Sequence, residues 1–591
     1  MLRSPPARRR RRPTRATTPA SRHRGLILPN AADMIALGLI VIVAVLTMVG
    51  VGELAAPLPS APEGGISLDP VHLPGYALQT TLRMLTALRF SLLFTLIYAP
   101  LAAKLPRAGR VLVAALDILQ SVPVTGYLAL GAAALFQGVP GNPLRAELVA
   151  TFALFTSQAW NMTFSFYQSL RTVPHDLDDA ARAFRLSPWR RFWRLELPFA
   201  MPGLVWNMMM SMAGGWFFVV AAEAITVGDH QVLLPGIGSY VALAIQHRSL
   251  PAIGWALLAM TVTITLYDQL MFQPLVAWAD KFRVEHAVGT VAPRSWLLRV
   301  IRRTRLLRRF GALLAWIRAV TGQVPGRWQR PGSGAARRRR AGSLKFWDML
   351  TLGLTLAVMA IGIGILVRAI GDQTTTAELR DMLVMAGATL ARITVMLALA
   401  CGIWVPIGVM IGLRPRLAEH LQPLVQFLAS FPANLLFPPV VLVIVRFDLD
   451  PDLWLSPLIL LGTQWYILFN VIAGTANLPT DLRDAAVMFQ LRGRSWWRRL
   501  IIPGILPSLV TGLITAAGGA WNASIVAETV SWGSTTISAT GLGSAIAAAS
   551  AAGDDRRVAL GIGFMTVLVI VINHLVWRPL YRYAERRLTL D

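Results

Sequence analysis

Long apolar stretches constrain this chain more than any other feature of its sequence. Residues 34–52 read "MIALGLIVIVAVLTMVGVG" and include no charged side chain, and a helix needs roughly 20 mostly apolar residues to cross a bilayer. The chain has 591 residues, of which 55% are hydrophobic and only 15% are charged, whereas about a quarter of the residues in soluble domains are charged. The sequence therefore predicts an all-α polytopic membrane protein.

Twelve stretches are predicted to span the membrane, in two sets of six. The first set lies at 34–52, 77–102, 111–136, 147–170, 199–226 and 251–275. The second set lies at 346–368, 381–412, 420–446, 455–474, 504–530 and 558–578. This pattern divides the chain into a basic N-terminal tail (1–33), a first repeat (34–282), a basic linker (283–345) and a second repeat (346–591).

The basic residues are distributed unevenly along the chain, whose formal net charge is +26. Arginines crowd residues 3–24 and 281–345, whereas the loop at 53–76 contains no Lys or Arg. Positive charge gathers on the cytoplasmic side of membrane proteins, so the tail, the linker and both termini are expected in the cytoplasm. Arginines placed beside membrane spans in this way favour anionic lipid over nucleic acid as their partner.

The two halves of the chain repeat one another in a constant register. A shift of 305 residues takes Pro174 to Pro479, Asp179 to Asp484, Pro198 to Pro503, Trp216 to Trp521, Glu223 to Glu528, Gly236 to Gly541, Gly238 to Gly543 and Pro274 to Pro579. Farther upstream, "QSVP" at 120–123 matches "ASFP" at 429–432 with a shift of 309. Because each half has an even number of spans, the two copies share one orientation, which is the parallel kind of transporter repeat.

Each half contains a short basic segment between two spans. The first reads "DDAARAFRLSPWRRFWRLELP" (178–198) and the second "RDAAVMFQLRGRSWWRRLIIP" (483–503). Asp176 is expected to cap a short cytoplasmic helix and Asp179 to lie in its first turn, and Pro198 suits the first turn of the next span. The paired alanines leave a small-residue patch that another protein can approach closely. Two such segments predict docking on a partner with two equivalent sites.

These segments resemble the EAA loop of permease subunits of ABC importers, in which acidic-Ala-Ala is followed by Gly and then by Ile-x-Leu-Pro. Both copies depart from that pattern, with Asp in place of Glu and with Arg185 and Gln490 in place of Gly. The resemblance assigns coupling to an ATPase to Asp179, Ala180, Ala181, Arg185, Pro198, Asp484, Ala485, Ala486, Gln490 and Pro503.

The resemblance implies the type I ABC importer permease fold in a bacterial inner membrane. It also implies two copies of a cytoplasmic ATPase subunit and an extracytoplasmic substrate-binding protein as partners. The chain has no G-x-x-x-x-G-K-[ST] phosphate loop, so ATP and Mg are expected on the ATPase, with no cofactor and no enzymatic activity on this chain. Trp216 and Glu223 before "GIGSY" (236–240), with Trp521 and Glu528 before "GLGS" (541–544), resemble the subgroup that imports nitrate, sulfonate, taurine or bicarbonate.

Polar residues inside spans are costly and therefore mark functional candidates. The residues expected to line the translocation path or its gate are Gln120, Ser121, Gln158, Trp216, Glu223, Ser430, Gln464, Trp521 and Glu528. Glu223 lies 25 residues beyond Pro198, roughly 37 Å along a straight helix. It is therefore expected near the outer interface, in a gate or packed beside the Gly-x-Gly loop, and interhelical hydrogen bonding is the alternative role for the neutral residues.

Other functions remain open at this stage. Iron(III) and thiamine importers also include fused permeases with twelve spans. An ion-coupled secondary transporter would need Glu223 and Glu528 as its coupling site and would leave the two basic segments unexplained. The eight histidines and the single cysteine, Cys401, show no metal-ligand spacing, and no catalytic cluster supports a membrane-embedded enzyme.

Overall fold

The computed structural model describes residues 65–105, 108–121, 123–124, 126–128, 143–227, 230–282, 297–299, 375–476, 478–577, 579–580 and 583–584. The predicted tail (1–33), the predicted spans at 34–52 and 346–368, and all but three residues of the predicted linker (283–345) lie outside these residues. The chain divides into two compact units, Met1–Val41 with Arg299–Pro325, and Ile42–Leu298 with Gly326–Asp591. Every helix and strand named below belongs to the second of these units.

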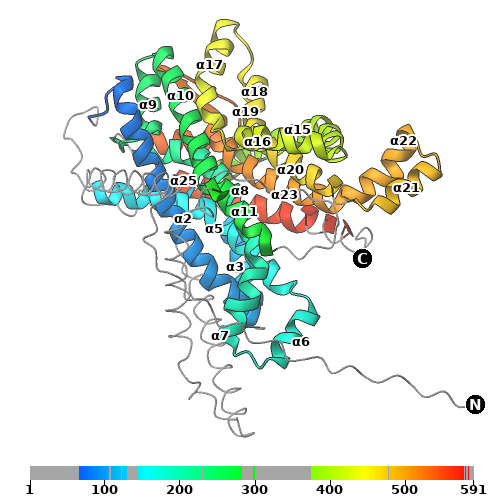
Figure 1. Ribbon diagram of the computed structural model, residues 1–591. Coiled ribbons are helices and arrows are strands. Elements are labelled where there is room, and N and C mark those ends of the chain that lie inside the picture. The colour runs from blue at the N-terminus through cyan, green and yellow to red at the C-terminus, as the bar shows by residue number, and fades with distance from the viewer. Residues whose placement is uncertain are drawn as a thin grey trace, which may run out of the picture. The chain divides into compact units, whose positions relative to one another are not determined.

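The first half of this unit is built from helices that follow the predicted spans (Figure 1). They are α2 (Leu73–Lys104), α3 (Ala108–Ser121), α5 (Pro143–Arg171), α6 (His175–Ala183), α7 (Pro188–Arg191), α8 (Leu197–Glu223), α9 (Ile237–Gln246), α10 (Leu250–Tyr267) and α11 (Gln273–Ala279). The helices α2, α5 and α8 pack together as the centre of this half.

The second half repeats this order. Its helices are α15 (Thr376–Gly412), α16 (Pro415–Ser430), α17 (Phe437–Arg446), α18 (Pro451–Trp454), α19 (Ser456–Leu461), α20 (Gln464–Ala476), α21 (Thr480–Met488), α22 (Gly493–Trp496), α23 (Ile502–Ala527), α24 (Leu542–Ala551) and α25 (Asp555–Ile572). The packing of α15, α20 and α23 corresponds to that of α2, α5 and α8. The predicted helical repeat is therefore confirmed in three dimensions.

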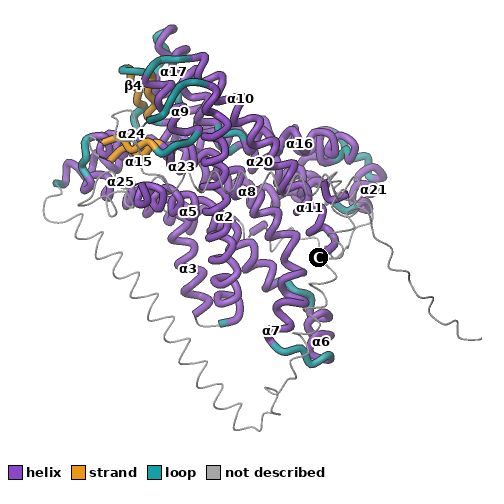
Figure 2. Tube along the Cα trace, turned by 60° about the vertical axis from the view of Figure 1, so that its left-hand side comes forward, coloured by secondary structure: helices purple, strands orange, loops and turns teal. Residues whose placement is uncertain are grey.

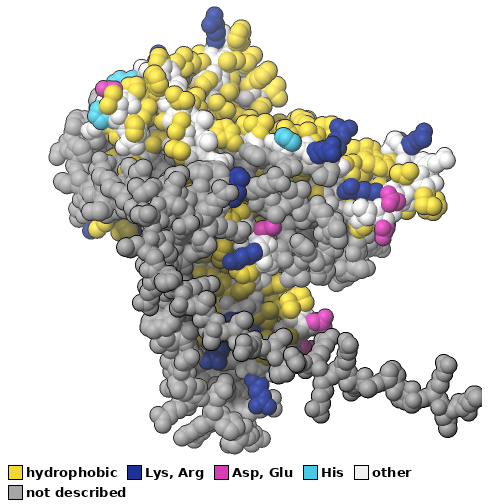
Figure 3. Space-filling model, in the orientation of Figure 1, with side chains coloured by type: hydrophobic (Ala, Val, Ile, Leu, Met, Phe, Trp, Pro, Cys, Tyr) yellow, Lys and Arg dark blue, Asp and Glu magenta, His cyan; other side chains and the backbone are white. Residues whose placement is uncertain are grey.

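The described residues contain six helices long and apolar enough to cross a membrane, or up to eight if each bent pair counts as one span. The prediction of twelve spans is thus reached only in part within the described residues. Apolar side chains lie on the outside of these helices, and on α2 Phe90, Leu93 and Ile97 are each more than half exposed. Hydrophobic side chains also cover much of the described surface in Figure 3, as expected for helices in contact with lipid tails.

Two antiparallel hairpins interrupt the helical pattern. Strands β1 (Ala224–Val227) and β2 (His230–Leu233) follow α8, and β3 (Thr529–Trp532) and β4 (Thr535–Ser538) follow α23. Figure 2 shows them in orange among the helices. The predicted spans at 199–226 and 504–530 therefore end slightly too late, because the helices stop at Glu223 and Ala527.

A break in one span brings the two halves together. The helical segments Leu424–Ser430 and Ala433–Arg446 are bent by 78°, and Pro432 lies at the break. Beyond the break, Asn434 Nδ2 donates to the Phe217 carbonyl at 3.0 Å. In the other direction the Val124 N–H donates to Asn522 Oδ1 at 2.6 Å, so hydrogen bonds cross between the halves in both directions.

A short π-helical segment precedes a proline at four places in the chain. These segments are η2 (Phe192–Glu196), η3 (Asp268–Phe272), η6 (Trp497–Ile501) and η7 (Asn573–Trp577). Proline lacks an N–H and its ring crowds the carbonyl four residues earlier, and a π turn opens the helix by one residue. Pro198, the second residue of α8, consequently does not end the helical rod that runs from Pro188 to Glu223.

Candidate functional site

The two basic segments fold into the short helices α6 and α21. Their N-caps are Pro174 and Pro479, and neither side chain caps the helix. The prediction that Asp176 is the cap is wrong, because α6 begins at His175 and Asp176 is its second residue. Asp179 was expected in the first turn, but it is the fifth helical residue and lies just beyond that turn; the acidic residues of the first turn are Asp176 and Asp178.

Both helices end in the same left-handed turn. Arg185 and Gln490, which stand where the related permeases have Gly, have φ of 49° and 51°. The turn is closed by the Leu186 N–H donating to the Ala181 carbonyl at 3.0 Å and by the Leu491 N–H donating to the Ala486 carbonyl at 2.9 Å. These bonds satisfy carbonyls that a helix end leaves free, so the two copies keep the glycine-type turn without glycine.

Only part of the expected alanine patch faces outward. Ala181 and Ala486 are buried beneath their helices, whereas Ala180 is exposed and Ala485 is half-buried. Asp179 and Asp484 are both exposed. Large apolar side chains lie exposed beside them, at Phe184, Trp189 and Trp193 in the first copy and at Val487, Met488 and Phe489 in the second. Contiguous exposed apolar surface of this kind marks a site of protein contact.

The first copy alone is held by a chain of ion pairs. Arg191 bonds to Asp178 at 2.6 Å and to Glu196 at 3.0 Å, and Lys104 at the end of α2 bonds to Glu196 at 2.6 Å. The 305-residue shift places Arg483, Trp496 and Ile501 at the positions of Asp178, Arg191 and Glu196. The two segments thus share a backbone shape but differ in how they are fastened to the helices above them.

Glu223 lies at the opposite end of α8, in a buried cluster of charges. Arg83 donates to Glu223 through Nη1 and to Glu147 through Nε at 2.8 Å, and the side chains of Arg83 and Glu223 are completely buried. The Gly238 N–H donates to the Glu223 carboxylate at 2.6 Å. The cluster therefore joins α2, α5 and α8 to the start of α9.

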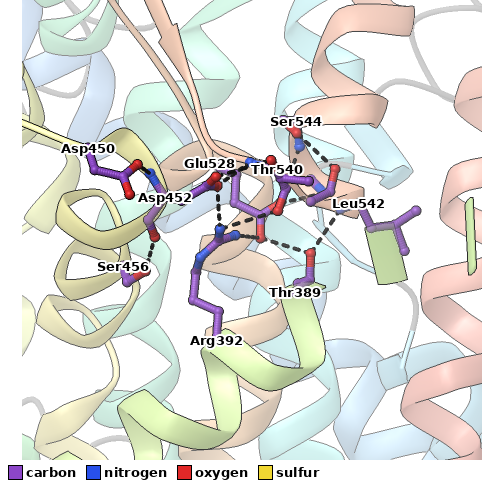
Figure 4. A network of polar contacts seen from close by, with 11 residues as sticks. Thr389, Arg392, Asp450, Asp452, Ser456, Glu528, Thr540, Leu542 and Ser544 are labelled. Carbon is purple, nitrogen blue, oxygen red and sulfur yellow. Dashed lines mark hydrogen bonds and ion pairs between the residues drawn. The ribbon is translucent and has the colours of Figure 1, made fainter. Parts of the chain in front are cut away.

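Glu528 occupies the corresponding place in the second half (Figure 4). Arg392 donates to Glu528 at 2.7 Å and to Asp452 at 3.1 Å, and Thr389 donates to Glu528 at 2.8 Å. The Gly543 N–H donates to Glu528 at 2.7 Å. Asp452 is half exposed, so the second cluster is more open to solvent than the first.

The Gly-x-Gly sequences make these clusters possible. A Cβ atom at Gly236 or Gly541 would lie 2.3 Å from an atom of the Glu223 or Glu528 carboxylate, well inside van der Waals contact. The α9 and α24 helices can approach the carboxylates only because no side chain stands between them.

Sequence reasoning missed the partners of these two glutamates. Arg83 and Arg392 are related by the 309-residue shift, and Glu147 and Asp452 by the 305-residue shift. Extending the repeat comparison to the charged residues on both sides of "QSVP" would have found them. A buried charge needs a charged and hydrogen-bonded partner, which gives a physical reason to look for an Arg.

A cavity of about 820 Å³ lies between the two halves. Among its lining side chains are Gln120, Val124, Thr156, Ser157, Trp160, Asn161, Phe164, Ser165, Gln168, Trp206, Asn207, Met210, Ser211, Phe218, Tyr466, Asn470, Thr511, Thr515, Trp521, Asn522, Asn573, His574 and Trp577. None of the described residues lining it is Asp, Glu, Lys or Arg. The described lining is therefore polar and aromatic.

Two of the predicted path residues, Gln120 and Trp521, line this cavity. The side chain of Ser121 lies outside the described residues. The other predicted path residues do not line the cavity. Gln158 donates to Met212 Sδ, and Trp216 packs on Tyr267. Ser430 donates to the Gln426 carbonyl, Gln464 accepts from Trp404, and Glu223 and Glu528 belong to the charge clusters.

The cavity extends toward the ends of α5 and α25. Gln168 lies three residues before the end of α5, which leads into α6, and His574 and Trp577 belong to η7 at the end of α25. Toward the other end of α8, Phe218 is the last residue that lines the cavity. Val219, Val220 and Glu223, which follow it in α8, are buried. The cavity therefore lies on the side of the charge clusters that faces α6, whereas packed side chains fill the interior beside Glu223.

Comparison with known proteins fits this geometry. The family model described as "Binding-protein-dependent transport system inner membrane component" matches residues 91–271 and again residues 404–590. The chain belongs to this family. The two matches confirm that it combines two copies of the permease component of an ABC importer, as the EAA-type segments indicate, and the family's members are membrane components rather than enzymes.

Several curated permeases are similar to parts of this family member. A bicarbonate transport system permease protein, CmpB, of Synechocystis is 31% identical over 143 residues, which is 24% of this chain and 50% of CmpB. A nitrate import permease protein, NrtB, of Leptolyngbya laminosa is 26% identical over 189 residues, which is 32% of this chain and 64% of NrtB. A glycine betaine/proline betaine permease, ProW, of Escherichia coli is 30% identical over 176 residues, 29% of this chain and 47% of ProW. The chain spans about half the length of the curated relatives it matches.

Proposed function

We propose that this chain forms the whole membrane pathway of an ATP-driven importer, with both permease halves in one polypeptide. The observation that carries the proposal is the pair of coupling helices, α6 and α21, which share one left-handed turn and present exposed apolar residues beside Asp179 and Asp484. Two copies of a cytoplasmic ATPase subunit would cover these surfaces and hold the ATP and Mg. A substrate-binding protein would deliver solute at the opposite face.

The proposed cargo is a small anion such as nitrate, bicarbonate or a sulfonate. The similarity to bicarbonate and nitrate permeases supports it, as does a cavity with no carboxylate in its lining, because a carboxylate would repel an anion. The proposed orientation places both coupling helices in the cytoplasm. The cavity would then face inward, ready to release solute, and closure of the ATPase pair would draw the coupling helices together.

The buried charge clusters weigh against an ion-coupled secondary transporter. Such a transporter would use Glu223 and Glu528 as its coupling site, yet each is bound to an Arg and to a Gly N–H and neither lines the cavity. We assign them instead to holding the outer ends of the two halves in shape.

Co-purification tests the proposal. The detergent-solubilised chain is expected to bring down an ATP-hydrolysing subunit, and the double substitution Asp179→Arg/Asp484→Arg is expected to abolish that association while leaving the chain monodisperse. Asp176→Arg/Asp481→Arg is the matched control for added charge on the same helices. Equal recovery of ATPase with both double variants, or a chain that transports under an ion gradient without ATP, would overturn the proposal.

A further inference from the structure

Three side chains at the central cavity offer hydrogen-bond donors that the described residues leave unused. Trp160 Nε1 and Ser211 Oγ are buried atoms without a partner among the described residues. Tyr466, whose hydroxyl likewise forms no hydrogen bond within the described part of the chain, also lines the cavity. These three residues are called the donor cluster below.

Helix packing across the two halves brings two members of the donor cluster, Ser211 and Tyr466, close together. Ser211 and Gly214 are three residues apart and so lie on one face of α8, and both line the cavity. A Cβ atom at Gly214 would lie 3.0 Å from the Tyr466 hydroxyl, which places that hydroxyl within about one helical turn of Ser211. Trp160 belongs to α5, which packs along the length of α8.

Several other polar groups of the cavity are engaged inside the protein. Thr156 donates to the Ala153 carbonyl at 2.7 Å, and Asn207 donates to Ser165 at 2.8 Å. Asn522 donates to the Gly518 carbonyl and accepts from the Val124 N–H. In contrast to these three groups, the donor cluster still has hydrogens to give.

A buried donor without an acceptor costs free energy that a ligand can recover. Ser211 lines the cavity but is only 2% exposed, so its hydroxyl becomes available to a solute through a small shift of the side chain. Three N–H and O–H donors with no Asp or Glu beside them call for a ligand rich in acceptor oxygens. The absence of Lys and Arg from the lining leaves the ligand's charge uncompensated, which keeps binding weak enough for release.

We propose that Trp160, Ser211 and Tyr466 bind a small oxyanion in transit through the cavity. This inference rests on the proposed function for the class of cargo, and it adds the residues and the mode of recognition, by neutral donors. The alternative occupant is a quaternary ammonium solute, because the aromatic rings at Trp206, Trp521 and Trp577 could hold a cation by cation–π contact. The unused donors favour the oxyanion, since an ammonium group accepts no hydrogen bond.

Binding of sodium nitrate to the purified full chain, measured by isothermal titration against a sodium chloride background, tests the inference. Tyr466→Phe and Ser211→Ala each remove one hydroxyl, and each is expected to weaken nitrate binding about tenfold, since a hydrogen bond to a charged acceptor is worth at least that factor. Tyr267→Phe is the matched control, because the Tyr267 hydroxyl is also buried and without a partner in the described structure but does not line the cavity. It should leave nitrate binding unchanged.

Sodium bicarbonate and glycine betaine are titrated in parallel. Binding of nitrate or bicarbonate that weakens in both hydroxyl variants and not in the control supports the proposal. Binding that is equal in all four proteins, binding of glycine betaine alone, or binding of none of the three solutes overturns it.

The result is separable from that of the co-purification experiment. If the ATPase associates but the hydroxyl variants bind normally, the donor cluster is wrong and the importer function stands. If the donor cluster binds oxyanion but no ATPase associates, the importer function fails and the binding site stands.

Discussion

Loss of the buried arginine should affect the two charge clusters to different extents. Arg83→Met leaves Glu223 with the Gly238 N–H and the Thr80 hydroxyl as donors, at a site with no exposure of Arg83 or Glu223 to solvent. Breaking a buried ion pair by removing one partner costs about 3–5 kcal/mol. We expect the loss for Arg83→Met to fall in that range.

Arg392→Met is the matched variant in the second half. Glu528 would keep three donors, from Thr389, Gly543 and Ser544, and Asp452 is 50% exposed and can turn to water. The loss should therefore be smaller, about 1–3 kcal/mol for a partly compensated group. The midpoint of thermal unfolding in detergent, followed by the monodisperse fraction after heating, should fall further for Arg83→Met than for Arg392→Met.

A second variant separates unpaired charge from lost packing. Arg83→Met/Glu223→Gln removes both charges of the pair while keeping an acceptor for the Gly238 N–H, so it should recover part of the lost stability. Equal unfolding midpoints for Arg83→Met and Arg392→Met, or a double variant less stable than Arg83→Met alone, would refute the reasoning.

Three further outcomes follow from the same contacts. Gly541→Ala would place a methyl 2.3 Å from a Glu528 carboxylate oxygen and should lower the unfolding midpoint by an amount equivalent to about 1–3 kcal/mol, whereas Gly387→Ala, which meets nothing within 4 Å, should not. Gln490→Gly should relieve a left-handed conformation that costs about 1 kcal/mol and leave ATPase association intact; a lower midpoint would count against the strain. Asp178→Asn should speed limited proteolysis of the segment at 171–197 but not of that at 476–502, because only the first is tied by the Arg191 ion pairs; equal rates would argue against that tie.

Much of the fold follows from pattern in the sequence. Apolar length predicts helices α2, α8, α15 and α23 because a bilayer leaves a backbone few other ways to satisfy its hydrogen bonds. The constant 305-residue shift predicts that the halves repeat, and the break at Pro432 follows from proline chemistry.

The candidate site was predicted less completely. Asp179 and Asp484 could be proposed as coupling residues from the sequence because the EAA-type segments are local, with all their defining residues within some twenty positions. The partners of Glu223 were missed because Arg83 is 140 residues away along the chain, and no local sequence pattern indicates that the two residues pair. Likewise Gln158 and Trp160 are neighbours in sequence, but only Trp160 lines the cavity.

The sequence by itself determined that this chain is a membrane protein, that its halves are copies, and that two EAA-type segments recur in one register. These properties depend on local composition and spacing, which a linear reading retains. Only the tertiary structure decided which polar residues pair, which remain buried and which meet the cavity, because a helix presents neighbouring residues to different surroundings. The packing of α5, α8 and α20 thus selects Trp160, Ser211 and Tyr466 from many polar residues of similar appearance.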